Sequence, residues 1–143
     1  MEEVDVAVHT LSIRSSHRQE LIDITRQVEE AVGRTNAPAV VVYVPHTTAG
    51  IVINEHADPD VARDILTALD HVVPSDGQYR HGEGNTPAHV KTCMVGSSQF
   101  IPVVDSRLAL GRWQGIFLAE FDGPRTRQVL VSVLDGVAGG DVS

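Results

Sequence analysis

The chain is poor in cysteine, in basic side chains and in long apolar runs, and each shortage excludes a class of protein. Cys93 is the only cysteine among 143 residues, whereas a small secreted domain normally carries an even set. No run reaches the roughly 18 apolar residues that a membrane-spanning helix needs. The start Met1-Glu2-Glu3 lacks the basic residues of a secretory signal. We therefore expect a cytoplasmic protein with no membrane association.

The shortage of basic residues also restricts the partners. Lys and Arg number 11 against 19 Asp and Glu, which gives a formal charge of -8. Nucleic-acid binding depends on neutralising many phosphates with Lys and Arg, and docking on an anionic membrane needs a basic surface. Both are disfavoured, but a small phosphorylated molecule can still be held by a metal or by a few well-placed arginines.

A length of 143 residues predicts a single domain, residues 1–143. A domain of this size buries about 68–70% of its unfolded surface, so it needs no disulfides to hold a core.

Two amphipathic patterns and one short segment predict helices. A capping box at Ser16 and Gln19 precedes apolar residues at helical spacing, and Gly33 can end that helix. Asp58 and Pro59 form a good N-cap and first helical position for a second helix. The apolar faces consist of Leu21, Ile24, Val28 and Ala31 in the first helix, and of Val61, Ile65 and Leu69 in the second. A third, shorter helix is predicted over residues 87–95.

The rest of the chain favours strands. Val4, Val6 and Val8 alternate with other residues in the period of a half-buried strand. Segment 38–45 is apolar on both faces, which is typical of a central strand. Further strands are predicted at 47–53, 99–104, 113–121 and 128–134. The polar loop 74–87 is long enough to be functional. The predicted fold is α+β, a compact β-rich domain of mostly antiparallel sheets with two or three helices.

Three histidines are candidates for a metal site. His46 directly follows the apolar strand, His81 lies in the polar loop, and His89 begins the short helix. Imidazoles placed in this way can converge on a metal and leave a fourth position for water or substrate. Each could also be a solvated loop residue, because no local spacing here is a strict metal signature. We expect Cys93 to be a small buried residue and Trp113 to pack in the core.

Several charged residues could act on a phosphorylated ligand. Lys91, Arg107 and Arg125 lie in stretches that otherwise look buried or turn-like, where a guanidinium suits phosphate binding. An ion pair with an acidic residue is an equally open interpretation for each. Glu55 and Asp58 flank a predicted turn and could assist a histidine, although Asp58 serves equally well as a helix cap.

Taken together, these segments resemble the YjbQ family, also named the secondary thiamine-phosphate synthase family. The resemblance extends over about residues 4–135. It rests on the following blocks in order: His46-Thr47-Thr48-Ala49-Gly50, Asn54-Glu55, Ala57-Asp58-Pro59, His81 with Glu83, Pro87-Ala88-His89-Val90-Lys91, Gly111-Arg112-Trp113-Gln114-Gly115 and Glu120-Phe121-Asp122-Gly123-Pro124-Arg125.

The resemblance implies properties that spacing alone does not give. It implies a YjbQ-like α+β domain that assembles as a homotrimer, and a divalent metal, with zinc expected, on His46, His81 and His89. It also implies a weak ability to join the pyrimidine and thiazole halves of thiamine phosphate with release of pyrophosphate.

Two kinds of function remain open at this point. The first is an enzyme, either a thiamine-phosphate synthase-like transferase or a metal-dependent phosphoester hydrolase, and the histidines favour hydrolysis because diphosphate chemistry usually recruits magnesium through carboxylates. The second is a non-enzymatic module that binds a metal and an anion. An acid–base residue beside the metal would distinguish them, and the candidates are Glu55, Glu83 and Glu120. The candidates for substrate or phosphate binding are Thr47, Thr48, Asn85, Lys91, Arg107 and Arg125.

Overall fold

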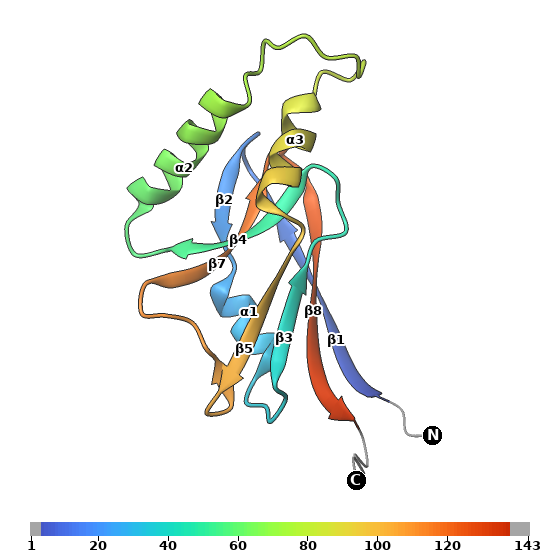
Figure 1. Cartoon of the computed structure of the whole chain (residues 1–143), viewed down its shortest axis with the longest axis vertical. Helices are drawn as coiled ribbons and strands as arrows, with labels where there is room; N and C mark the ends of the chain where they lie inside the picture. Colours follow the sequence, from blue (N-terminus) through green and yellow to red (C-terminus); the bar gives the residue numbers. More distant parts are fainter. Residues whose placement is uncertain (1–3, 138–143) are drawn as a thin grey trace.

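A computed structural model describes residues 4–137 (Figure 1). The strands are β1 (Val4–Arg14), β2 (Glu20–Asp23), β3 (Ala39–Tyr43), β4 (Ala49–Glu55), β5 (Ser98–Val104), β6 (Arg107–Leu108), β7 (Gln114–Glu120) and β8 (Thr126–Val137). The helices are α1 (Thr25–Val32), α2 (Pro59–Val72) and α3 (Thr86–Val95). The α+β prediction is therefore confirmed.

The strands form two antiparallel sheets. The larger has the order β1-β8-β3-β5-β6 and the smaller the order β2-β7-β4. The strand predicted to be central, β3, pairs with β8 on one side and β5 on the other. The β5–β6 turn is a two-residue hairpin at Asp105 and Ser106, both with positive φ, as this tight turn requires.

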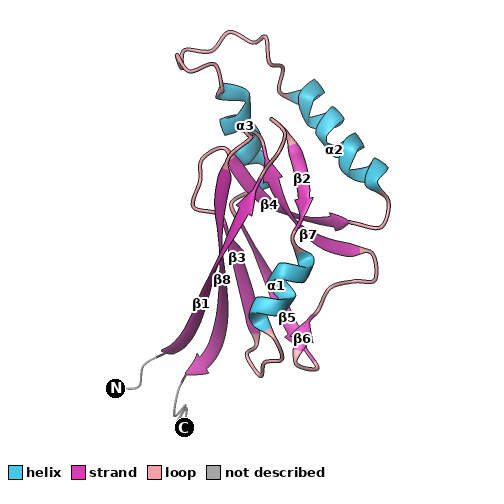
Figure 2. Cartoon of the chain, turned by 180° about the vertical axis from the view of Figure 1, so that it is seen from behind, coloured by secondary structure: helices cyan, strands magenta, loops and turns pink. Residues whose placement is uncertain are grey.

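The core lies between the two sheets and α1. Fully buried residues of the larger sheet pack against fully buried residues of the smaller sheet and of the α1 region. They are Val40 and Val42 of β3, Val129 and Val131 of β8, Ile51 of β4, Ile116 and Leu118 of β7, and Ile24 and Val28 at α1. Figure 2 shows α1 on this inner side of the larger sheet. The opposite face of the larger sheet carries exposed apolar side chains, among them Tyr43 and Phe100.

Helices α2 and α3 lie together near one end of the smaller sheet (Figure 1). Leu66 and Leu69 of α2 and Val95 of α3 pack with Leu21 and Phe121 of that sheet region. Asp58 caps α2 as predicted, because its side chain accepts a hydrogen bond from the Asp60 backbone N–H at 2.9 Å. No helix in the part of the chain that the structure describes is long and apolar enough to cross a membrane.

The predicted capping box at Ser16 and Gln19 is wrong. The chain continues as strand β2, where Leu21 pairs with Ala119 of β7, and α1 begins only at Thr25. Glu20 instead accepts hydrogen bonds from the backbone N–H groups of Ser16 and His17. Pairing with β7 therefore overrides the local helical pattern, while the predicted helix end near Gly33 is correct.

Two predicted core residues are on the surface. Trp113 is 55% exposed and lies before β7, where the Arg112 guanidinium stacks 4.8 Å from its ring centre. Cys93 is exposed because the inner face of α3 is formed by Ala88, Lys91 and Thr92.

Candidate functional site

A polar cavity of about 370 Å³ lies where three loops meet the first turns of α3. The β3–β4 loop contributes two threonines, the loop before α3 and α3 itself contribute polar side chains, and the β7–β8 turn contributes an ion pair. The lining residues are Thr47, Thr48, Glu83, Asn85, His89, Asp122 and Arg125. All of these except Asp122 are residues that the sequence predicts for the site. We call this space the arginine cavity.

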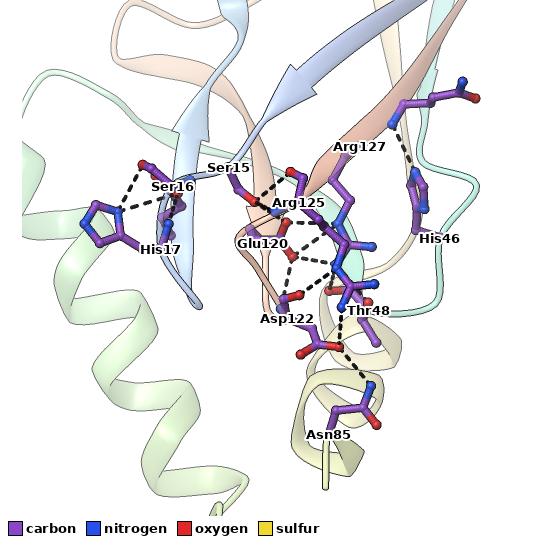
Figure 3. Close-up of polar contacts among 12 residues, drawn as sticks. Ser15, Ser16, His17, His46, Thr48, Asn85, Glu120, Asp122, Arg125 and Arg127 are labelled. Carbon is purple, nitrogen blue, oxygen red and sulfur yellow. Dashed lines mark hydrogen bonds and ion pairs between the residues drawn. The ribbon is translucent and has the colours of Figure 1, made fainter. Parts of the chain in front are cut away.

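The ion pair between Arg125 and Asp122 at the cavity wall is partly exposed, and the β7–β8 turn fixes the orientation of the Arg125 side chain. Arg125 donates from Nε to the backbone oxygen of Asp122 at 2.8 Å and from NH2 to the Asp122 carboxylate at 3.1 Å. Asn85 donates to the same carboxylate oxygen at 2.9 Å. The Ser15 hydroxyl accepts the Arg125 backbone N–H at 2.9 Å, which fixes the start of β8 (Figure 3).

A fully buried ion pair lies beneath the cavity. Glu120 of β7 and Arg127 of β8 join the two sheets, with side chains 0% and 2% exposed. Arg127 also donates to the backbone oxygen and hydroxyl of Thr48 at 3.2 and 2.8 Å. Burial by itself would raise the pKa of Glu120, but hydrogen bonds from Arg127, Ser15 and the Asp122 N–H lower it overall. Glu120 and Arg127 are therefore both charged, and the bonds from Arg127 to Thr48 hold the β3–β4 loop in place.

Two of the three predicted metal-binding histidines lie together. The rings of His81 and His89 are 5.3 Å apart at their centres with planes at 88°, and a hollow of about 270 Å³ lies between them and Thr86. The Thr86 hydroxyl is buried and makes no hydrogen bond among the described residues. His81 Nε2 lies 3.5 Å from a Glu83 carboxylate oxygen.

The third histidine, His46, lies apart from this pair. Its Nε2 accepts the backbone N–H of Gln128 at 3.0 Å, and in Figure 3 it lies beyond Arg127 and away from Asn85. Burial and the guanidinium groups of Arg127 and Arg125 lower its pKa, against an opposing effect of Glu120, so the ring is neutral at pH 7.

Among the described side chains, those of residues 8–134, no group of three or more His, Cys, Asp or Glu is arranged to hold a metal ion. The side chains as they stand therefore do not form a ready three-histidine zinc centre, and the metal stays a prediction.

Four other predicted site residues lie outside the arginine cavity. Lys91 is buried on another face of α3, where it pairs with Asp70. Arg107 lies in β6 and lines a separate cavity of about 250 Å³ with Arg34. Glu55 is the last residue of β4, at the far end of that strand from the cavity threonines, and it pairs in register with Gln114 of β7. Glu120 lies under the cavity with its carboxylate oxygens engaged by Arg127, Ser15 and the Asp122 N–H.

Sequence reasoning missed Arg127 and Asp122. The sequence does contain a pattern that could have identified Arg127. Arg127 alternates in step with Val129, Val131 and Val133, so all four side chains point to the same, buried face of β8. A charged residue in phase with buried valines predicts a buried ion pair, since a lone buried charge is too costly. Asp122 gives no comparable signal in its turn.

The two antiparallel sheets and the helices packed against them make this chain a small α+β protein. Residues 9–136 match the family described as UPF0047 protein YjbQ-like, and the chain belongs to that family. The chain is 51% identical over 128 residues to UPF0047 protein YugU of Bacillus subtilis, covering 87% of this chain and 97% of YugU. It is 48% identical over 124 residues to a UPF0047 protein of Methanocaldococcus jannaschii, covering 85% and 90% of the two chains.

Solved structures agree with this assignment. A YjbQ/UPF0047 family protein from Clostridium acetobutylicum superposes with a TM-score of 0.82 at 52% identity, covering 86% of this chain and 97% of that one. A YbjQ-like protein of unknown function from Sulfolobus solfataricus has a TM-score of 0.87 at 33% identity, covering 94% and 100%.

Proposed function

We propose that the arginine cavity binds a small phosphorylated molecule and that the chain is an enzyme acting on it. The observation that carries this proposal is the presence of the Arg125 guanidinium and the His89 imidazole in one polar cavity of about 370 Å³. A guanidinium provides paired donors for phosphate oxygens. The exposed hydroxyl of Thr47 is a further donor at the same rim.

The charges of the cavity bear on the cofactor. Arg125 shares the cavity wall with two carboxylates, Asp122 and Glu83, so these three side chains have a formal net charge of -1. A phosphate dianion placed there is repelled unless a cation accompanies it. This balance supports the predicted divalent metal, with zinc favoured by the neighbouring imidazoles of His81 and His89. We derive no chemical step through that metal.

The reaction we propose is the one implied by the family resemblance. The thiazole phosphate nitrogen forms a bond to the methylene carbon of the hydroxymethylpyrimidine pyrophosphate. The bond from that carbon to the pyrophosphate oxygen breaks, and pyrophosphate leaves with the electron pair. Arg125 would hold a phosphate group, and the hydroxyl of Thr47 would donate to an oxygen of the leaving group.

A second candidate is phosphoester hydrolysis. Glu83 is the one acid–base candidate of the sequence analysis that lines the cavity, and its side chain is 74% exposed beside His81. An ionised carboxylate in contact with water can act as a general base on that water. Glu83 is therefore the proposed base for hydrolysis, in place of Glu55 and Glu120.

We also propose that the protein is a homotrimer. The outer face of the larger sheet exposes Val8, Tyr43, Phe100 and Val104, which are 56%, 42%, 64% and 57% accessible. Register places Phe100 opposite Val41 and Val41 opposite Ser132, so these side chains belong to one continuous sheet surface. Contiguous exposed apolar patches usually mark interaction surfaces. Another copy of the chain is the proposed occupant.

The ligand proposal is tested with the Arg125→Gln variant and the matched control Arg26→Gln. Arg26 is an exposed arginine of α1 that pairs with Glu30. Inorganic phosphate and pyrophosphate are titrated calorimetrically with and without Zn²⁺. The loss of a charged hydrogen-bond partner should weaken metal-dependent binding by about 10-fold or more in Arg125→Gln alone. Equal affinities in both variants would contradict the site.

The reaction is tested separately with Glu83→Gln. Thiamine-phosphate formation and phosphoester hydrolysis are assayed on the wild type and the variant, with zinc content measured on both and on His89→Gln. Loss of general base catalysis should reduce hydrolysis by about 10²–10⁴-fold while the variant keeps its fold. A wild type with no turnover in either assay, but with intact anion binding, would favour the non-enzymatic binding module. A zinc content equal in wild type and His89→Gln would remove the histidine pair as the metal site.

A further inference from the structure

A second polar cavity lies against another face of α3. It encloses about 310 Å³ and is lined by Arg18, Gln19, Asp70, Ser75 and Lys91, with Phe121 and the first turn of the helix. Residues 85 and 89 border the arginine cavity, whereas residues 87, 88 and 91 border this one. At about 100° per residue, these two sets point to different sides of the helix. We call this space the lysine cavity.

The lysine cavity contains a buried cation. The side chain of Lys91 is 5% exposed, although lysine is rarely buried so deeply unless it is fully paired. Its ammonium donates to Gln19 at 2.6 Å and to Asp70 at 2.5 Å. An ammonium carries three N–H donors. The described residues accept two of them, so one N–H of Lys91 has no acceptor among these residues.

The one carboxylate of the cavity wall does not balance its cations. Asp70 is 53% exposed and is already engaged by Lys91 and Gln19, and the Lys91 hydrogen bond lowers its pKa, so it stays ionised. Arg18 also lines the cavity and makes no ion pair with any side chain that the structure describes, those of residues 8–134. Arg18 and Lys91 against Asp70 give a net charge of about +1 at pH 7, in a chain whose total formal charge is -8.

The two cavities therefore have opposite electrostatic character. The arginine cavity has one cation and two carboxylates, so phosphate there depends on an added metal. The lysine cavity has two cations and one carboxylate, so it attracts an anion without a metal. The N-terminal end of the ten-residue helix α3 borders both cavities, so its positive dipole adds to each and the side-chain charges make the difference.

We propose that the lysine cavity is a second anion site, separate from the arginine cavity, that binds inorganic phosphate. The Arg18 guanidinium donates to two oxygens, the unused N–H of Lys91 donates to a third, and the Ser75 hydroxyl is placed to donate to the fourth. The site stands independently of the proposed enzymatic function, because none of its polar residues lines the arginine cavity.

The test is a calorimetric titration of the full chain with inorganic phosphate in the presence of EDTA. Wild type should bind phosphate without metal. Arg18→Gln should bind at least 10-fold more weakly, since it removes a charged donor. Arg26→Gln makes the same change of net charge on an exposed part of α1 and should bind like wild type, which controls for non-specific attraction.

Two further variants complete the experiment. Arg125→Gln should keep metal-free binding, because its cavity is the other one. Lys91→Gln should lose binding as Arg18→Gln does, and since it alters a buried residue, its circular dichroism and melting are compared with wild type. Absence of metal-free binding in wild type overturns the proposal, as does equal binding by Arg18→Gln and Arg26→Gln. Binding that requires Zn²⁺ and is lost only in Arg125→Gln reports on the arginine cavity. Failure of the proposed function and failure of the lysine-cavity proposal are therefore distinguishable.

Discussion

Replacing Arg127 by methionine tests how much the buried ion pair contributes to stability. Arg127 is 2% exposed and bonds both to Glu120 and to Thr48. Methionine removes those donors and leaves the Glu120 carboxylate buried with only Ser15 and the Asp122 N–H as partners. Breaking a buried ion pair by removing one partner typically costs about 3–5 kcal/mol. We expect a loss in the free energy of unfolding within that range.

The assay is urea unfolding at pH 7 and at a fixed protein concentration, because self-association would make stability depend on concentration. The matched control is Arg125→Met, whose partner Asp122 belongs to a half-exposed pair at 3.1 Å. Exposed pairs contribute only about 0–1 kcal/mol. A double variant, Glu120→Met with Arg127→Met, should recover most of the loss, because hydrophobic replacement of a whole buried pair is often neutral.

The pH dependence has a defined sign. The pKa of Glu120 is lowered below the usual 4.5 of a glutamate in the folded state. Its contribution is therefore fully present above pH 4.5 and is lost as the pH falls through the folded-state value. The deficit of Arg127→Met relative to wild type should be full at pH 7 and should shrink below pH 4.5. A variant within about 1 kcal/mol of wild type at pH 7, or a deficit that grows in acid, would refute the reasoning.

Three further changes have expected outcomes. Gly50→Ala should cost about 1–3 kcal/mol by urea unfolding, because its methyl would lie 2.5 Å from the Gly96 backbone oxygen, whereas Gly82→Ala meets nothing within 4 Å and should be neutral. Asp58→Ala should cost about 1 kcal/mol through loss of the α2 cap, and an unchanged midpoint would show that the cap does not contribute. Phe100→Asp should shift sedimentation from trimer to monomer, whereas Val72→Asp, equally exposed on α2, should not; a trimer in both variants would exclude this sheet face as the interface.

Local pattern was enough for the elements that depend on nearby residues. The Asp58-Pro59 pair begins α2, and Gly96 ends α3, because cap geometry is set within one turn of the helix. The doubly apolar segment before His46 predicted the central strand correctly. The helix predicted from Ser16 failed because a long-range pairing with β7 took residues 20–23 into a sheet.

For the candidate site, the sequence by itself determined which chemical groups are available and which loops carry them. Thr47, Asn85 and Arg125 lie in polar turns between apolar elements, and such turns end up at the surface where ligands bind. Only the tertiary structure decided which of these groups meet. Lys91 and Arg125 are both cations in stretches that look buried or turn-like, but they line cavities on different sides of α3. Glu120 of the smaller sheet forms its ion pair with Arg127 of the larger sheet. Such partnerships depend on strand register and helix phase between segments far apart in the chain, and neither is encoded in the spacing of the residues concerned.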